Sequence, residues 1–193
     1  MTASPAGGDG KADLDLAVLL PELAEIGDDE LRAGVEALWQ RLWHLSSWTD
    51  VMDVPVASHI ATPQVNHTRA VTRMALAMAD IVSELHGVEL RRDLLVAAAL
   101  VQDACKMIEY EADEAGGTRR TEIGRKLGHA AYGAAVAIEV GLPLDVVNVI
   151  LSHSPDASVP WGSVEARILV YADQADVAAL GGDRFIRKMF QYR

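Results

Sequence analysis

An apolar segment that ends in a polar cluster constrains this chain more than any other feature of its sequence. The eight residues from Leu94 to Val101 are all apolar, and the chain continues Gln102-Asp103-Ala-Cys-Lys106. Because a helix that is apolar on every side is buried on every side, this segment predicts a central helix over residues 91–105. Burying a carboxylate beside such a segment costs several kcal/mol unless a cation or strong donors meet it. Asp103 therefore needs a partner at the end of this helix.

The sequence offers Asp103 two kinds of partner. Lys106 lies three residues further on, close to the same face of a helix, and would form an ion pair at the helix end. Histidines from other helices would instead share a metal ion with the carboxylate. This segment alone leaves both interpretations open, and an ion pair is at least as common as a metal site.

Length, composition and charge fit one helical domain and exclude several classes of protein. The chain has 193 residues, half of them apolar, and no apolar run approaches the ~20 residues that cross a bilayer. The N-terminus lacks the features of a secretory signal, and one cysteine excludes internal disulfides, so we expect a reduced, cytoplasmic protein. The net charge of −11 argues against binding to nucleic acid or to an anionic membrane. A small anionic substrate and a homo-oligomeric state both remain compatible with the sequence.

Apolar periodicity predicts an all-α fold. Residues 1–12 are polar and glycine-rich and are expected to be a disordered tail, whereas residues 13–193 are expected to form a single helical domain. Helices are predicted over residues 31–45, 63–85, 126–140, 143–153 and 163–179, with Asp28 and Gly87 as caps. The polar segment 110–126 contains two adjacent glycines and is expected to be a loop that includes at most a frayed helical turn. No alternating pattern predicts a strand.

Three histidines lie near the ends of predicted helices. His67 and His129 are in first turns, and His153 is at a helix end. Singly, each is more often a packed or surface histidine than a ligand. Asp173 follows a second apolar run, as Asp103 follows the first. Together these residues fit a nitrogen–oxygen metal site, although periodicity alone does not show that they converge.

This set of residues, in this order, resembles the HD-domain superfamily of metal-dependent phosphohydrolases over about residues 60–180. The segment Leu94–Lys106 resembles the family's apolar run followed by His-Asp-x-x-Lys. Gly128-His129-Ala-Ala-Tyr-Gly-Ala-Ala resembles its His-x-x-x-Gly-Ala helix, the residues from Leu142 to His153 resemble its next helix, and Ile168 to Asp173 resembles its closing Asp motif. The additional histidines His129 and His153 resemble those of the subgroup that binds two metals. This subgroup includes dinucleoside polyphosphate hydrolases and HD-GYP phosphodiesterases.

The resemblance implies two metal positions that share one carboxylate. The first metal would be held by His67, residue 102, Asp103 and Asp173, and the second by Asp103, His129 and His153. The namesake histidine of the family is Gln102 here, and an amide oxygen is a weaker donor than an imidazole nitrogen. The first position should therefore be weaker, shifted toward harder ions, or empty. The divalent ion, one or two per chain, stays open among Mn, Fe, Zn, Ni and Mg.

The resemblance also implies a hydrolase acting on a phosphorylated small molecule or nucleotide. A divalent ion lowers the pKa of a bound water and polarises a phosphoryl oxygen. Asp103 would orient the metal and accept a proton, and Lys106 would neutralise charge on the phosphoryl group. Three basic residues of the next loop would reach an anionic substrate or form a solvated surface: Arg119, Arg120 and Arg125. The same scaffold also suits a metal-dependent oxygenase, a hydratase, an amide hydrolase, or a non-catalytic HD-like binding protein.

Overall fold

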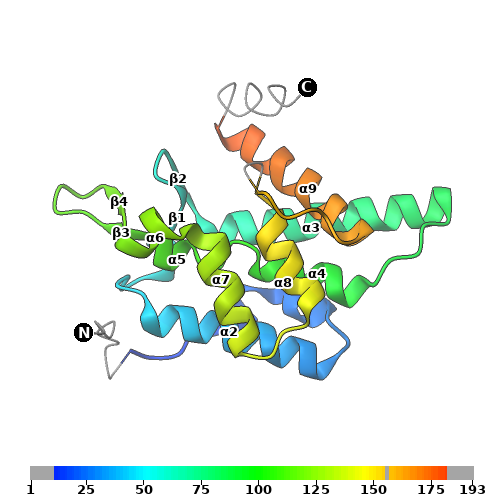
Figure 1. Cartoon of the computed structure of the whole chain (residues 1–193), viewed down its shortest axis with the longest axis horizontal. Helices are drawn as coiled ribbons and strands as arrows, with labels where there is room; N and C mark the ends of the chain where they lie inside the picture. The colour runs from blue at the N-terminus through cyan, green and yellow to red at the C-terminus, as the bar shows by residue number, and fades with distance from the viewer. Residues whose placement is uncertain (1–10, 155–156, 182–193) are drawn as a thin grey trace.

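A computed structural model describes residues 11–154 and 157–181, which form a bundle of helices with two short hairpins (Figure 1). The α-helices are α1 (Leu16–Leu19), α2 (Asp29–Leu45), α3 (Gln64–His86), α4 (Arg92–Val101), α5 (Lys106–Glu109), α6 (Glu122–Lys126), α7 (Gly128–Glu139), α8 (Leu144–Ser152) and α9 (Val164–Gly181). The all-α prediction is confirmed. The expected disordered tail falls, up to residue 10, outside the described residues. Within the described part of the chain, no helix is long and apolar enough to span a membrane.

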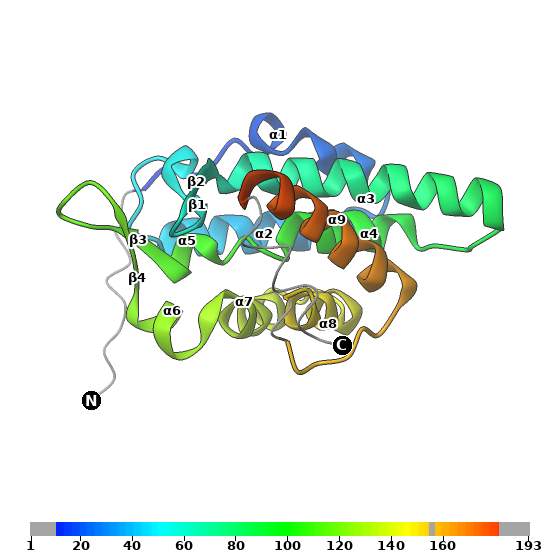
Figure 2. The same ribbon diagram turned by 90° about the horizontal axis from the view of Figure 1, so that it is seen from above.

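The apolar segment is the central helix, as its composition predicts. Every residue from Leu94 to Val101 is at most 7% exposed, and α4 packs against α2, α3, α8 and α9. Figure 2 shows α4 between α3 on one side and α8 on the other. One apolar cluster joins α4 to α2, α7 and α8, and a second joins it to α3 and α9. Four helices thus meet around α4, and the first turn of α3, the middle of α9 and the end of α8 lie near Asp103.

The central helix is shorter than predicted: it ends at Val101, whereas the sequence predicts an end at residue 105. The next residues form a tight turn in which Ala104 N–H donates to Val101 O and Lys106 N–H donates to Asp103 O. The Trp39 indole N–H donates to Leu100 O at 2.9 Å and satisfies one of the carbonyls that a helix end leaves unpaired. Asp103 is therefore presented from a turn between α4 and α5, and not from a continuous helix face.

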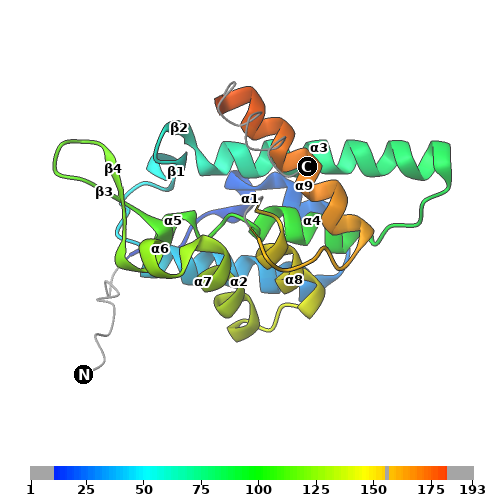
Figure 3. The same ribbon diagram turned by 45° about the horizontal axis from the view of Figure 1, so that its top comes forward.

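Two antiparallel hairpins lie at the same end of the molecule (Figure 3). One pairs β1 (Pro55–Ala57) with β2 (Ile60–Pro63), and the other pairs β3 (Tyr110–Ala112) with β4 (Thr118–Arg120). The expectation of a loop over residues 110–126 was wrong for the part that forms the second hairpin, whereas the short helix α6 agrees with the expected helical turn. The turn of the hairpin is closed by Asp113, whose Oδ1 accepts the N–H groups of Ala115 and Gly117. This turn chemistry specifies a hairpin without an apolar alternation.

The long helix α3 carries His67 in its first turn and has the cap that the sequence predicts. It ends at Gly87, whose φ of +65° makes the predicted glycine C-cap. Asp28 caps α2 by accepting the N–H groups of Glu30 and Leu31, also as predicted. Helix α3 packs along α9, which sets the first turn of α3 beside the middle of α9.

Candidate metal centre

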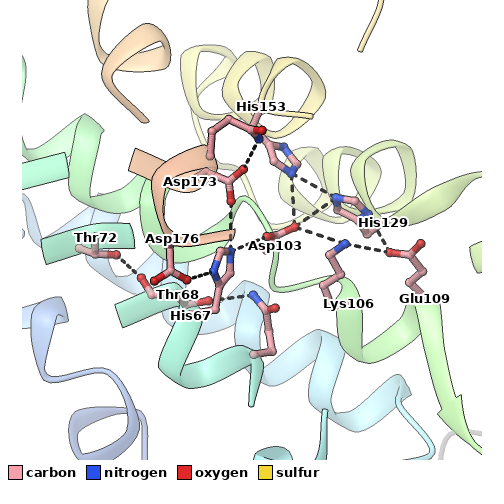
Figure 4. A network of polar contacts seen from close by, with 12 residues as sticks. His67, Thr68, Thr72, Asp103, Lys106, Glu109, His129, His153, Asp173 and Asp176 are labelled. Carbon is pink, nitrogen blue, oxygen red and sulfur yellow. Dashed lines mark hydrogen bonds and ion pairs between the residues drawn. The ribbon is translucent and has the colours of Figure 1, made fainter. Parts of the chain in front are cut away.

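One group of side chains that could hold a metal ion joins α3, the turn after α4, and α9 (Figure 4). His67 Nε2 lies 3.1 Å from Asp103 Oδ2 and 3.1 Å from Asp173 Oδ1. All three side chains are at most 6% exposed. Their ligand atoms lie close enough to one another to hold a single ion.

A second group joins the same aspartate to the start of α7 and the end of α8. Asp103 Oδ1 lies 3.1 Å from His129 Nε2 and 3.3 Å from His153 Nε2, and the two histidine nitrogens are 3.1 Å apart. Asp103 therefore offers one oxygen to each group, as a bridging carboxylate does. The structure brings together five of the six residues that the sequence predicts as metal ligands: His67, Asp103, His129, His153 and Asp173.

The other ring nitrogen of each histidine faces a hydrogen-bond acceptor. His67 Nδ1 lies 2.6 Å from Asp176 Oδ2, His129 Nδ1 lies 2.7 Å from Glu109 Oε2, and His153 Nδ1 lies 2.8 Å from Ile150 O. Because an ionised carboxylate and a carbonyl only accept, each Nδ1 carries the proton. In the neutral imidazole, each Nε2 then points a lone pair into the site. This is the arrangement that orients metal-binding histidines in proteins.

Three atoms that offer lone pairs meet in the second group, and this arrangement suits a cation. The lone pairs of His129 and His153 and an oxygen of Asp103 form a triangle without a proton donor between them. Asp103 Oδ1 is buried and accepts no hydrogen bond of good geometry. Three acceptors at this spacing repel one another unless a cation, which can be a metal ion or a proton, lies between them.

A proton takes the place of the cation at His67 when no metal is bound. Burial opposes the imidazolium, but hydrogen bonds to Asp103, Asp173 and Asp176 outweigh burial and raise the pKa of His67 to about 11. Burial also opposes the carboxylate of Asp103, yet the charge of Lys106 and the hydrogen bond from the protonated His67 keep its pKa well below its usual range. A divalent ion must displace such protons, so metal binding at this site is coupled to proton release.

Lys106 lies beside the two groups, so the ion pair expected from the sequence and the histidine cluster occur together. Its Nζ is 3.9 Å from Asp103 Oδ1 and 3.4 Å from Glu109 Oε2. Burial opposes the ammonium, but the two carboxylates raise its pKa above the ordinary value. Lys106 also lines a cavity with Asp103, His129, His153 and Asp173. It is therefore a charged group in position to meet an anion.

Gln102 is the predicted ligand whose position the contacts do not explain. Its side chain is 1% exposed, and neither its amide oxygen nor its amide nitrogen has a hydrogen-bond partner. An unpaired buried amide costs about 1–3 kcal/mol. A cation beside the amide oxygen would remove part of that cost, so its role as a ligand stays a prediction.

The three predicted substrate-binding arginines take different places. Arg119 pairs with Glu111 on the β3–β4 hairpin at 3.0 Å, and Arg125 donates to the carbonyl of Arg120. Arg120 alone reaches the polar network, with Nη2 3.2 Å from Glu109 Oε1. None of the three lines the cavity beside Asp103.

Two carboxylates of the site were missed by the sequence reasoning. Glu109 contacts Lys106, Arg120 and His129, and Asp176 contacts His67. Burial opposes the ionised form of Glu109, but the hydrogen bond from His129 and the charge of Lys106 lower its pKa to about 2. The available signal was spacing, since each lies three residues after a predicted site residue and so on the same side of a helical turn.

We expect Glu109→Gln to weaken metal binding about tenfold without unfolding the chain. The amide keeps the size of the side chain but loses the charge that orients His129 and pairs with Lys106, and such partners are worth roughly 10–100-fold in affinity. Titration of the metal-free variant with Mn²⁺ measures the effect. Glu111→Gln, which makes the same change on the β3–β4 hairpin, is the control. Equal affinity in Glu109→Gln and the parent would contradict the orienting role.

Comparisons with known proteins agree with this geometry. The family model described as the HD domain matches residues 65–178, and the chain belongs to this family. The dihydroneopterin 2′,3′-cyclic phosphate phosphodiesterase of Methanocaldococcus jannaschii is 36% identical over 113 residues, which make up 58% of this chain and 45% of that protein. The chain thus matches less than half the length of this relative. No solved structure shows significant similarity.

The family membership confirms the resemblance drawn from the sequence. HD domains bind divalent metal ions, and the two groups of His and Asp side chains around Asp103 could hold one or two such ions. All the residues of both groups lie within the matched range.

Proposed function

We propose that this chain is a metal-dependent phosphohydrolase that acts on a phosphorylated small molecule, and that the bond it hydrolyses belongs to a phosphodiester. The observation that carries the proposal is the triangle of acceptors formed by Asp103, His129 and His153, with edges of 3.1 to 3.3 Å. The M. jannaschii relative, which is named a phosphodiesterase, supports the choice of bond.

Each residue of the centre has a role in this proposal. The first ion would be held by His67, Asp103 and Asp173, with Gln102 as a weaker ligand, and the second by Asp103, His129 and His153. A divalent ion there supplies a Lewis acid, which lowers the pKa of a bound water and polarises a phosphoryl oxygen. Lys106 binds the charged phosphate oxygens, and Glu109 holds both Lys106 and His129 in place.

The charges of the cavity favour this function over the alternatives. Among the described residues that line the cavity, Lys106 is the one cation, and it lies within 3.9 Å of the bridging carboxylate. A lysine beside the candidate ligands suits a substrate that is itself an anion. Neutral substrates of an oxygenase or an amide hydrolase would gain nothing from it.

We expect the full chain to hydrolyse bis(4-nitrophenyl) phosphate only when a divalent ion is bound. Release of 4-nitrophenolate is followed after removal of metal with a chelator and after return of Mn²⁺, Fe²⁺, Zn²⁺ or Mg²⁺ one at a time. Activity should disappear with the chelator and return with at least one ion. If the loaded protein hydrolyses neither this diester nor 4-nitrophenyl phosphate, the proposed function is wrong.

A further inference from the structure

The cavity beside the candidate metal centre has a polar half and an apolar half. The polar half holds Lys106, Ser154, Gln174 and four of the five candidate ligands: Asp103, His129, His153 and Asp173. The apolar half is formed by Val56, Ala57 and Ile60 from the β1–β2 hairpin and by Val177 from α9. The cavity measures about 100 Å³, well below the roughly 300–1,000 Å³ of sites that enclose a drug-sized ligand. It therefore has room for the reacting end of a substrate and little more.

The apolar half is separate from the core of the domain. Val56, Ile60 and Val177 form their own cluster, with Ala57 packed against it. None of them belongs to the two clusters that surround α4. A hairpin of this length is only marginally stable by itself, and here its apolar side chains turn toward α9 and the site. The cluster is thus placed to meet a ligand as well as to hold the hairpin.

We propose that Val56, Ile60 and Val177 form a subsite for the apolar ester group of a phosphate ester, whose phosphate lies beside Lys106 and the candidate metal ligands. This inference rests on the proposed function and names its substrate class. The charge pattern supports it, because Lys106 offers a cation to the phosphate and the four residues of the apolar half offer apolar side chains to the group attached to it. Such a wall also excludes water from the reacting end of the substrate.

The subsite is tested by the binding of two small ligands that share one phosphate and differ in the ester group. Phenyl phosphate and methyl phosphate are titrated into the Mn²⁺-loaded full chain by calorimetry. The parent should bind phenyl phosphate at least tenfold more tightly. Ile60→Ala removes part of the wall, and Val177→Thr changes its polarity while keeping its shape. Each should reduce the preference to about threefold or less, since one methylene in an apolar pocket is worth roughly 10-fold or more.

Ile81→Ala makes the same change as Ile60→Ala on an exposed face of α3, where Ile81 is 55% exposed, and should leave the preference unchanged. Thermal melts and Mn²⁺ titrations show whether each variant is folded and loaded, and the isosteric Val177→Thr keeps the test valid if Ile60→Ala is unstable. A parent that binds both ligands equally or neither, or wall variants that keep the full preference, would overturn the subsite. Failure to hydrolyse both bis(4-nitrophenyl) phosphate and 4-nitrophenyl phosphate would instead overturn the proposed function, because the binding preference is read without turnover.

Discussion

Asp103→Ala should remove metal binding at both candidate positions and lower any hydrolase activity by at least about a thousandfold. Each oxygen of Asp103 faces a different group, with His67 near one oxygen and His129 and His153 near the other. Losing this carboxylate therefore takes one ligand from each ion at once. A group that several catalytic residues share has effects of this size, since such residues act as a unit. Elemental analysis after purification without chelators measures the loss.

Lys106→Ala is the matched comparison for this prediction. Lys106 Nζ lies 3.9 Å from Asp103 Oδ1, but Lys106 is not one of the candidate metal ligands. The variant should therefore keep its metal and lose turnover or anion binding. Asp103→Asn, which preserves shape, separates the loss of charge from the loss of packing. The assigned roles would be reversed if Lys106→Ala lost metal while Asp103→Ala retained it.

The parts of the fold that followed from the sequence are those set by local physics. A run that is apolar on every side, Leu94 to Val101, could only be a buried helix, and it is the centre of the bundle. Caps at Asp28 and Gly87 depend on one residue and its neighbours, and both were predicted correctly. The β3–β4 hairpin was missed because Asp113 and Gly116 determine its turn, while its strands carry no apolar alternation.

The candidate centre could be predicted only in part. Periodicity assigns a residue to a face of its own helix, but it does not measure the distance between His67 and Asp173, which are more than a hundred positions apart. Their order along the chain, compared with a known family, supplied that link. Spacing from Lys106 could have marked Glu109 as a candidate, but its contacts with Arg120 and His129 depend on how β4 and α7 pack. A Cβ on Gly124 would lie 2.3 Å from the backbone carbonyl of Glu109, so the close approach of α6 to this carbonyl depends on a glycine whose role no sequence pattern shows.

Gln102→His tests the position where this chain departs from its family. The variant replaces an amide that is 1% exposed and without a hydrogen-bond partner with an imidazole of similar reach. Because a neutral imidazole binds Zn²⁺, Fe²⁺ and Ni²⁺ better than an amide does, we expect tighter binding at the group of His67, Asp103 and Asp173. A gain of about 2 kcal/mol corresponds to roughly thirtyfold in affinity.

The same experiment decides whether residue 102 faces the metal. Metal-free parent and variant are titrated with one ion, and the variant should hold more metal per chain and bind its first-group ion more tightly. Gln40→His, which adds an imidazole on α2 where the parent glutamine contacts Leu14, controls for binding by an added histidine alone. If stoichiometry and affinity are equal in parent and Gln102→His, then residue 102 lies away from the ion. The first group would then consist of His67, Asp103 and Asp173 only. The unpaired amide of Gln102 would need another explanation.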